Sequence, residues 1–437
     1  MDQYFSKFKS QQKLNFSVID VESRVPIIKG IPLSLQHLFA MFGASILVPS
    51  LFHIDPSIVL LMNGVGTLLY LFLCKGKIPA FLGSSFAFIA PVFAVLGADQ
   101  NLWAINYPKV LGGFIVSGLI FMATAMIIRY FGTKWISILI PPAAMGPIVA
   151  LIGLELASVA TNMSGLMGNG NGSDYKSIGI SMFTLAVVIF SSLFLRGFLS
   201  TIPILIGIIA GYVLAYSLGM VNFSAIETAP LLKFPTTYWP KFQMSAVLII
   251  IPAALVVISE HIGHLIVTGN IVGRDLTKDP GLHRSLSGDG ISTMLSGFMG
   301  SVPTTTYGEN IGVMAVTKVY SVWVIGGAAV ISIVLAFSGT LSMLIQTIPT
   351  PVMGGVCILL FGIIASSGIR MLVESKVDYS QSYNLIVTAL VFVTGVSGVS
   401  MNIGSVPLKG MSLATVVAIA FNFSLYVIFK FKSYVKN

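Results

Sequence analysis

Apolar runs about as long as a membrane is thick dominate the pattern of hydrophobic and polar positions. From Pro32 to Phe429, runs of about 20 mainly apolar residues recur, and a helix of that length spans the hydrocarbon core of a bilayer. Short polar connections rich in glycine and proline separate them. The pattern predicts an all-α polytopic membrane protein with about fourteen transmembrane segments. We place them near residues 31–51, 56–74, 79–97, 109–130, 135–156, 178–196, 199–220, 244–269, 285–300, 303–318, 320–341, 350–368, 382–400 and 408–430.

Serine, glycine and proline shorten or break the segments at 79–97, 285–300 and 303–318. A helix that breaks inside the bilayer leaves backbone N–H and C=O groups unpaired, and a small polar ligand can satisfy them. Pro303 and the threonines after it favour an extended lead-in, after which Glu309 begins a short half-helix. We expect segments 3 and 10 to be interrupted. Their half-helix N-termini would offer N–H donors to carbonyl or anionic groups.

Composition excludes a soluble globular protein. Of the 437 residues, 55% are hydrophobic and 9% are charged, whereas soluble domains have about 25% charged residues. The two cysteines, Cys74 and Cys357, lie in apolar surroundings and do not make a disulfide framework.

The 24 lysines and arginines test the number of segments independently. With the N-terminus inside, only five of them fall in outer loops: Lys109, Lys176, Lys233, Lys241 and Lys409. The other 19 fall in the two tails or on the inner side of the membrane. Cytoplasmic loops show this excess. We therefore predict an even number of segments with both termini cytoplasmic. The same placement explains the net charge of +9 without a nucleic-acid partner.

The chain carries an internal repeat. Residues 140–146 (IPPAAMG) open one segment, and residues 348–354 (IPTPVMG) open another. Gly112-Gly113 and Gly326-Gly327 open the preceding segments, and the broken stretches near Ser84 and Tyr307 match in the same order. Two halves of seven segments have opposite orientations because seven is odd. Inverted repeats with paired interruptions predict a secondary transporter whose site lies near mid-membrane at the repeat interface.

Two carboxylates, Glu260 and Glu309, fall inside membrane-length segments. An acid at mid-bilayer costs about 2.5–3.5 kcal/mol, so it faces a protein interior or a watery pathway. Carboxylates accept hydrogen bonds from ring N–H groups, and beside half-helix donors they match the edge of a planar imide-like ring. His264 lies on the same helix face as Glu260, four residues on, and the pair could take up and release a proton. A purely structural acid and a hydrogen-bonded core histidine are the alternatives.

Other candidate chemistry is weaker. His261 lies off the face of Glu260 and His264, and we expect it to be structural. Glu155 lies near the outer end of segment 5 and is either structural or a lone intramembrane acid. The order Glu260-His261-x-x-His264 is not that of zinc peptidases, and no third ligand stands out, so we predict no metal. No phosphate loop, nucleotide fingerprint or nucleophile elbow occurs, so we predict no cofactor and no enzyme.

Two short polar motifs stand out, Gln36-His37 and Glu309-Asn310, the second followed by Gly312 and Thr317-Lys318. They resemble the signature elements of the nucleobase–ascorbate transporter family, and in particular of its uracil-carrying bacterial members. The likeness continues through residues 31–39 (IPLSLQHLF), 75–80 (KGKIPA), 82–88 (LGSSFAF), 279–285 (DPGLHRS), 305–310 (TTYGEN) and 374–379 (ESKVDY).

The resemblance implies a seven-plus-seven inverted repeat and proton-coupled uptake of uracil across a bacterial plasma (inner) membrane. It implies that Glu260 and Glu309 accept hydrogen bonds from the pyrimidine and that the backbone N–H groups of Phe86 and Gly308 donate to its carbonyls. It links His264 to proton coupling, together with Glu260. The implied domains are a tail (1–30), core parts 31–130 and 244–345, gate parts 131–243 and 346–430, and a C-terminal tail (431–437).

Three alternatives remain at this point. A permease for xanthine or another purine would share the scaffold. An anion exchanger of related architecture would carry a basic residue where Glu309 stands. A channel or a membrane enzyme is the third. The sequence leaves open the oligomeric state, a homodimer included, the proton stoichiometry, the affinity, and the roles of His37, His261 and Glu155.

Overall fold

The structure is a computed structural model that describes residues 18–167, 174–403 and 406–435. The predicted N-terminal tail before residue 18 and the last two residues of the predicted C-terminal tail lie outside the described residues, as do short parts of two outer loops.

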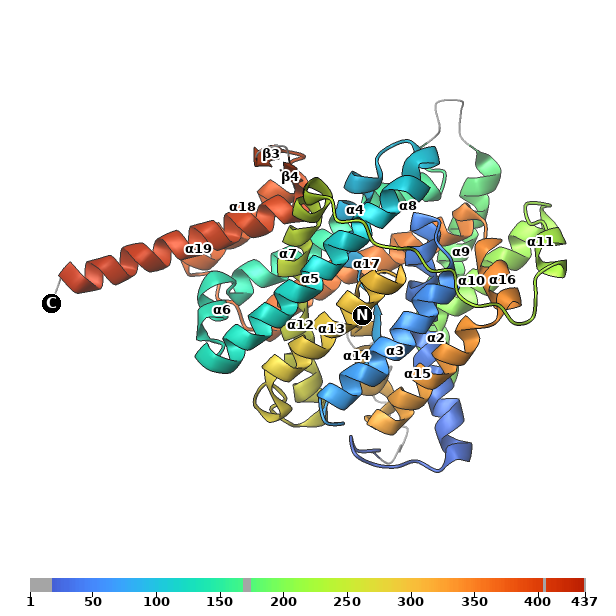
Figure 1. Cartoon of the computed structure of the whole chain (residues 1–437), viewed down its shortest axis with the longest axis horizontal. Helices are drawn as coiled ribbons and strands as arrows, with labels where there is room; N and C mark the ends of the chain where they lie inside the picture. Colours follow the sequence, from blue (N-terminus) through green and yellow to red (C-terminus); the bar gives the residue numbers. More distant parts are fainter. Residues whose placement is uncertain (1–17, 168–173, 404–405, 436–437) are drawn as a thin grey trace, which may run out of the picture.

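Most of the described chain is helical (Figure 1). Eight helical stretches are long and apolar enough to cross a membrane. They are α2 (Ile27–Phe52), α3 (Pro56–Leu73), α5 (Trp103–Phe131), α7 (Pro142–Glu155) continued by α8 (Ala157–Met163), α9 (Tyr175–Phe194), α12 (Met244–Val272), α17 (Thr350–Glu374) and α19 (Gly410–Val435).

Six shorter helices fall on the other predicted segments. Four of them are apolar: α4 (Ile89–Leu96) after the single turn η1 (Phe86–Phe88), α10 (Pro203–Ser217), α15 (Val322–Ala336) and α18 (Ser382–Val396). The remaining two are α13 (Leu282–Met299) and α14 (Gly308–Thr317). Within the described residues, every one of the fourteen predicted segments therefore has a helix, in the predicted order.

Some boundaries differ from the sequence-based prediction for a physical reason. The predicted segment 135–156 is broken into α6 (Lys134–Leu139) and α7, because Pro141 and Pro142 lack the N–H groups that would continue the helix. Gly112 and Gly113 do not open a segment but lie inside α5. A Cβ atom at Gly113 would come within 2.8 Å of the Ile250 side chain in α12, so this glycine allows two helices to pack closely.

The two interrupted segments pair with each other. Strands β1 (Leu82–Ser84) and β2 (Thr304–Thr306) are antiparallel, with Gly83 opposite Thr305. Two flanking bonds extend the ladder, from Ser85 N to the Pro303 carbonyl (2.9 Å) and from Tyr307 N to the Phe81 carbonyl (3.3 Å). Extended backbone was predicted for the second segment, but the pairing was not. It joins the two halves of the chain at one point.

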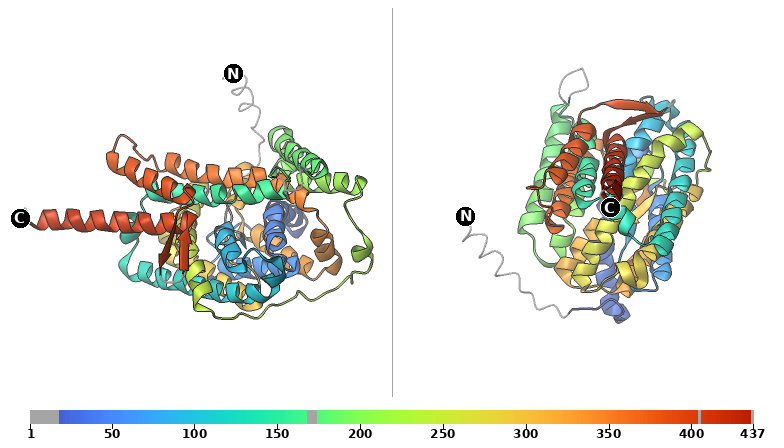
Figure 2. Two further views of the ribbon diagram at one scale, coloured as in Figure 1. Left: turned by 90° about the horizontal axis from the view of Figure 1, so that it is seen from above. Right: turned by 90° about the vertical axis from the view of Figure 1, so that its left-hand side faces the viewer.

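The connections between the helices lie at the two ends of the bundle. One long connection leaves α11 (Ser224–Glu227) and crosses the molecule to the start of α12 (Figures 1 and 2). A second connection, α16 (Gly339–Gln346), joins α15 to α17. A small hairpin of β3 (Ser400–Ile403) and β4 (Val406–Lys409) precedes α19, whose far end projects from the bundle (Figure 2).

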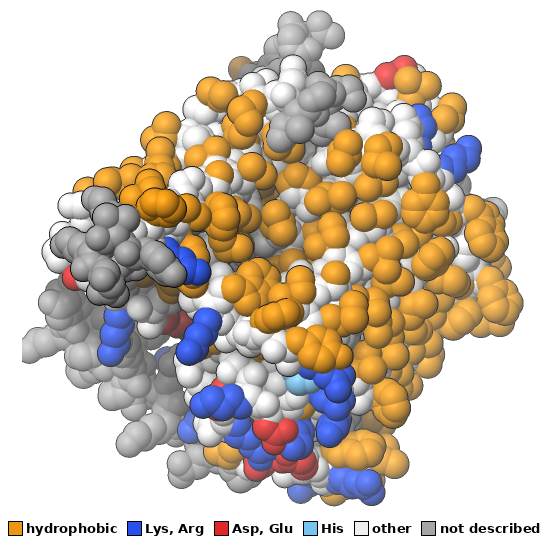
Figure 3. All heavy atoms as spheres, turned by 60° about the vertical axis from the view of Figure 1, so that its left-hand side comes forward, with side chains coloured by type: hydrophobic (Ala, Val, Ile, Leu, Met, Phe, Trp, Pro, Cys, Tyr) orange, Lys and Arg blue, Asp and Glu red, His pale blue; other side chains and the backbone are white. Residues whose placement is uncertain are grey.

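The surface is apolar over a broad band. Hydrophobic side chains cover most of the face drawn in Figure 3, and charged side chains gather toward its lower edge. Exposed large apolar residues occur along many helices, among them Phe190 and Leu193 of α9 and Val393 of α18. Soluble proteins do not expose apolar surface of this extent, whereas lipid-facing helices do. The chain is a multi-pass membrane protein.

Candidate functional site

A cavity of about 310 Å³ lies where the paired strands meet the middle of α12. The two interrupted segments contribute Phe86, Thr305, Tyr307, Gly308 and Glu309, and α12 contributes Glu260 and His264. The opposite wall comes from α7 and α17, with Val149, Ile363, Ser367, Arg370 and Met371 among its residues. The four residues predicted to bind the substrate, and the histidine predicted for proton coupling, therefore line one cavity.

The backbone offers hydrogen-bond donors in this cavity. Gly308 is the first residue of α14, and the first N–H groups of a helix have no intrahelical acceptor. Tyr307, at the N-cap of α14, makes no side-chain capping bond, and neither does Ser85 at the N-cap of η1. The N-termini at Phe86 and Gly308 therefore keep N–H groups available to a ligand.

Glu260 and Glu309 bring acceptors to the same cavity from two different elements. Glu309 lies in the first turn of α14, where the helix dipole favours a negative charge. Glu260 lies in the interior of α12, and both side chains are half-buried against the cavity. Neither carboxylate makes a hydrogen bond or an ion pair to another side chain in the described part of the chain. Two carboxylates without partners are costly in a membrane interior unless they serve a ligand or a proton.

The contacts of His264 define its tautomer. Its Nδ1 lies 2.8 Å from the Thr306 carbonyl oxygen, which can only accept, so Nδ1 carries a proton. A Cβ atom at Gly308 would lie 3.4 Å from His264 Nε2, so the second nitrogen faces the start of α14. Nε2 is therefore the atom at which this ring gains or loses a proton beside the site.

Aromatic rings bound the cavity. The Tyr307 ring stacks on the Phe86 ring with centroids 6.2 Å apart and planes 13° apart. Its hydroxyl donates to the Ser84 carbonyl oxygen at 3.0 Å, which fixes the ring across the β1–β2 pair. A Cβ atom at Gly83 would come within 2.3 Å of this ring, so only glycine fits there. Tyr307 was part of a predicted motif, but its position beside the cavity was not predicted.

A buried network behind the cavity holds the two interrupted segments together. The Asn310 amide donates to His37 Nδ1 at 2.8 Å and its oxygen accepts from Phe81 N at 3.3 Å. His37 is 1% exposed and lies in α2. The role of His37, which the sequence left open, is therefore structural support: it orients the Asn310 side chain that joins α14 to the chain before β1.

The sequence-based prediction missed a third intramembrane carboxylate, that of Asp289. Asp289 of α13 lies 3.1 Å from His261 Nδ1, and both side chains are fully buried. His261 Nε2 lies 2.7 Å from the Ser285 hydroxyl, and the Thr305 hydroxyl donates to Asp289 at 3.4 Å. His261 thus points away from the cavity into α13. Asp289 lies inside the predicted segment 285–300, and this position alone could have identified it as an intramembrane acid.

Glu155 lies away from the cavity. Its carboxylate accepts from the Met411 backbone N–H at 3.2 Å, at the start of α19. An acid at a helix N-terminus is a stabilising cap, so the structural alternative holds for this residue.

The central cavity continues toward the predicted cytoplasmic side. A larger cavity of about 720 Å³ shares Gly263, Val267, Met371 and Glu374 with it and extends past Arg274. A third cavity, of about 900 Å³, lies at the opposite end and has no lining residue in common with the central one. The central cavity therefore continues toward one end of the molecule and not toward the other.

Comparison with known proteins gives close relatives over the whole chain. A family model described as "Permease family" matches residues 29–404. The uracil permease of Paenibacillus larvae is 57% identical over 419 residues, which cover 95% of this chain and 98% of that protein. The uracil permease of Escherichia coli K12 is also 57% identical, over 94% of each chain, and that of Bacillus subtilis is 45% identical over 95% and 96%.

Solved structures resemble the fold at low sequence identity. SLC26A9 superimposes with a TM-score of 0.70 at 13% identity; the match covers 92% of this chain and 66% of that one. The transmembrane domain of the cyanobacterial bicarbonate transporter BicA gives a TM-score of 0.60 at 12% identity and covers 92% and 97%. Together with the helices described above, these likenesses confirm the predicted fold of fourteen segments in a seven-plus-seven inverted repeat.

Proposed function

This chain belongs to the permease family, the family that its motifs predicted, and on that premise we propose that it is a uracil permease. The single observation that carries the proposal is the central cavity. Two uncapped helix N-termini, one from each half of the chain, converge there with two unpaired carboxylates from the second half. Uracil has two ring N–H groups and two carbonyl oxygens around one flat ring, so the ligand and the cavity complement each other in donors and acceptors.

In our proposal, each polar group of the cavity has one task. Glu260 and Glu309 accept from the ring N–H groups, and the backbone N–H groups of Phe86 and Gly308 donate to the carbonyl oxygens. The stacked rings of Phe86 and Tyr307 provide an apolar edge for the flat heterocycle. Buried polar groups left unpaired by a wrong ligand cost about 1–3 kcal/mol each, which gives the site its selectivity.

We also propose that uptake is coupled to protons. Glu260 and Glu309 would move relative to the bilayer during transport, and the negative charges of two unpaired carboxylates are costly to bury. Protonation of Glu260 cancels part of that charge, and His264 Nε2, beside Gly308, supplies or accepts the proton. Uracil and a proton would then cross together, because the protonated, uracil-loaded site is less costly to move than the charged one.

The proposed movement is of the core (31–130 and 244–345) against the gate (131–243 and 346–430). The core would carry the paired strands, α12 and α14, whereas the gate would carry the opposite cavity wall from α7 and α17. In a bacterial inner membrane with both termini in the cytoplasm, the present arrangement would release uracil inward. A homodimer remains a prediction, which the mass of the purified protein in lipid nanodiscs tests.

Transport into proteoliposomes tests the proposal. We expect labelled uracil to accumulate when the outside is more acidic than the inside, and a protonophore to abolish the accumulation. A requirement for sodium in place of the pH gradient would overturn the proton coupling. Unlabelled xanthine should compete far more weakly than unlabelled uracil. Stronger competition by xanthine would assign the chain to the purine-carrying alternative.

A further inference from the structure

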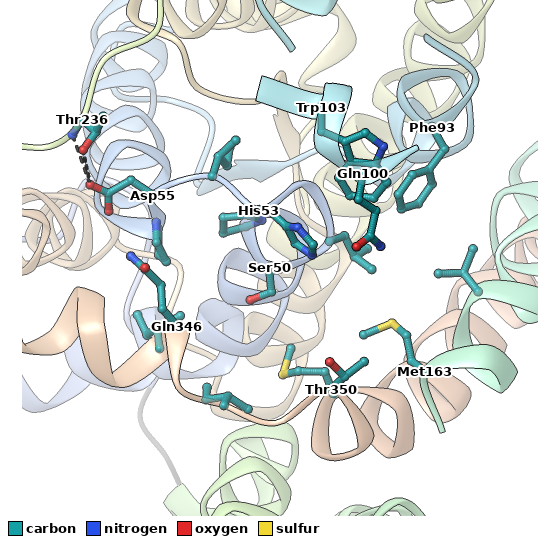
Figure 4. Close-up of a pocket in the computed structure, with 18 of the residues that line it drawn as sticks. Ser50, His53, Asp55, Phe93, Gln100, Trp103, Met163, Thr236, Gln346 and Thr350 are labelled. Carbon is teal, nitrogen blue, oxygen red and sulfur yellow. Dashed lines mark hydrogen bonds between the residues drawn. The ribbon is translucent and has the colours of Figure 1, made fainter. Parts of the chain in front are cut away.

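The largest of the three cavities lies at the outer end of the molecule and has no role in the mechanism above (Figure 4). It measures about 900 Å³. One wall comes from the end of α2 and from α4 and α5, and the other from α8 and the start of α17. The first group belongs to the proposed core and the second to the proposed gate. A movement between the two domains therefore changes this cavity directly.

Three aromatic rings gather on the core side of this outer cavity, and the Trp103 plane is tilted by 45° to that of His53 and by 49° to that of Phe93. The Trp103 ring lies 5.0 Å from the His53 ring and 5.8 Å from the Phe93 ring, measured between centroids. The indole N–H of Trp103 donates to the Gly97 carbonyl oxygen at 3.0 Å, which fixes the plane of the ring. The His53 side chain is exposed, and an exposed aromatic face binds flat heterocycles by stacking, with little dependence on which heterocycle it is.

His53 has a backbone conformation that glycine normally adopts. It terminates α2 with φ 55° and ψ 40°, in the left-handed region. Glycine is the usual residue at such a helix end, because a Cβ atom is unfavourable there. The chain instead places an imidazole at this position, and Figure 4 shows the ring pointing into the outer cavity beside Trp103. Strained positions of this kind concentrate at functional sites.

Polar groups without partners face the aromatic surface. Gln100 points its amide into the cavity (Figure 4). Asn162 of α8 lines the opposite wall. In the described part of the chain neither side-chain amide makes a hydrogen bond, and both residues are exposed in the cavity. A primary amide offers both a donor and an acceptor, so it can pair with the C(=O)–N–H edge of an imide ring.

We propose that the outer cavity is a second, weaker binding site for uracil, occupied before the central site opens to the outside. The inference rests on the proposed function, because uracil is the ligand whose flat ring and amide edges match this surface. The exposed His53 ring stacks with the ligand, the tilted Trp103 and Phe93 rings contact its edge, and Gln100 pairs with an amide edge. The domain movement then joins the outer cavity to the central one as it exposes Glu260 and Glu309, so the ligand is transferred over a short distance.

Tryptophan fluorescence of the full-length protein in nanodiscs tests this site. Replacing Trp135, Trp239 and Trp323 by Phe leaves Trp103 as the sole reporter. We expect uracil to quench this signal to saturation, both in this protein and when Glu309→Gln is added to weaken the central site. A matched protein that keeps only Trp239, which is 80% exposed on the outer connection, should show no saturable quenching.

Substitutions separate the ring of His53 from its backbone. His53→Gly keeps the left-handed conformation and removes the imidazole, so we expect it to weaken the quenching by about fivefold or more, the scale of one lost stacking contact. Gln100→Leu should act similarly. Neither change should alter equilibrium binding of labelled uracil at low concentration, which reports the central site. Pyrimidine, which lacks carbonyl and ring N–H groups, should quench about tenfold more weakly than uracil does.

The outcomes distinguish the two proposals. Labelled uracil that binds normally, with no saturable quenching of Trp103, would overturn the outer site and leave the proposed function intact. Equal quenching by pyrimidine, or quenching unchanged by both His53→Gly and Gln100→Leu, would also overturn it. Failure of labelled uracil to bind at all would instead overturn the proposed function.

Discussion

At the scale of single residues, the central cavity depends on carboxylates that the protein leaves without partners. Asp289 lies 3.1 Å from a histidine and Glu155 caps a helix, so these two acids are accounted for by the fold. Glu260 and Glu309 have no such partner in the described residues, and both face the cavity. The distinction between paired and unpaired acids separates structural carboxylates from those available to a ligand.

Glu309→Ala should weaken uracil binding. The change removes an acceptor and leaves a ring N–H group desolvated without a partner, which costs about 1–3 kcal/mol, or about 5–150-fold in the dissociation constant. Equilibrium binding of labelled uracil to the purified protein measures the effect. Glu155→Gln is the matched control, because it alters another acid in the membrane region and should leave uracil affinity unchanged. Wild-type affinity in Glu309→Ala would remove Glu309 from the site.

At the scale of secondary-structure elements, a buried aspartate ties together the two outer connections. Asp55 is the N-cap of α3 and accepts from the backbone N–H of Ser57 at 3.0 Å. It also accepts from the Thr236 hydroxyl (2.8 Å) and the Ser342 hydroxyl (2.8 Å), and it pairs with Lys233 at 3.2 Å (Figure 4 draws the Thr236 bonds). Lys233 and Thr236 belong to the connection before α12, and Ser342 belongs to α16. Both connections would join the core to the gate.

Asp55→Asn should weaken the contacts of Asp55 with the two outer connections and so lower the stability of the protein. Burial acts to raise the pKa of the Asp55 carboxyl, but the hydrogen bonds from Ser57, Ser342 and Thr236 outweigh it and lower the pKa from 3.8 to about 2. A depressed carboxyl pKa contributes stability above the unfolded value, and that stability is lost only as pH falls through about 2. The melting temperature should therefore fall in Asp55→Asn by the same amount at every pH from about 5 to 8.

Asp99→Asn serves as the control for Asp55→Asn. Asp99 is an exposed N-cap on the same outer side and accepts from Asn101 N at 3.0 Å. We expect its replacement to change the melting temperature much less than Asp55→Asn does. An effect of Asp55→Asn that vanished between pH 8 and pH 5 would contradict the depressed pKa.

At the scale of the whole molecule, the cavities describe one state of a transport cycle. The central cavity joins the inner one and is separate from the outer one. Across the boundary of the proposed domains, the Gln36 amide of α2 donates to the Thr201 hydroxyl of η3 (Gly197–Thr201) at 3.2 Å. A movement of the core against the gate would break this contact.

Cross-linking at this contact should stop transport without abolishing binding. With Gln36→Cys and Thr201→Cys, a short bifunctional methanethiosulfonate, which attaches to each thiol through a disulfide bond, should lock the inward-open arrangement. The native Cys74 and Cys357 are buried and need not be removed. We expect uptake of labelled uracil to cease and to return on reduction, and equilibrium binding to persist. Each single-cysteine variant, treated in the same way, is the control. Full uptake by the cross-linked protein would contradict a relative movement at this boundary.

Local patterns along the chain were enough to predict the class, the order of the segments and the identity of the unpaired acids. Burying apolar runs and charged groups in a bilayer has a cost that depends on each residue and its neighbours along the chain. Fourteen segments, the interruptions at segments 3 and 10, and Glu260 and Glu309 follow from that local cost. The breaks beside Pro141 and Pro142 were equally local and could have been predicted.

How distant stretches of the chain meet could be learned from the folded molecule alone. The pairing of Leu82 with Thr306, the contact of Asn310 with His37 and the partner of Asp289 all join residues far apart in the chain. The geometry of these contacts depends on how helices pack, and periodicity along the sequence does not contain it. The same holds for the outer cavity, whose two walls come from segments that share no local pattern.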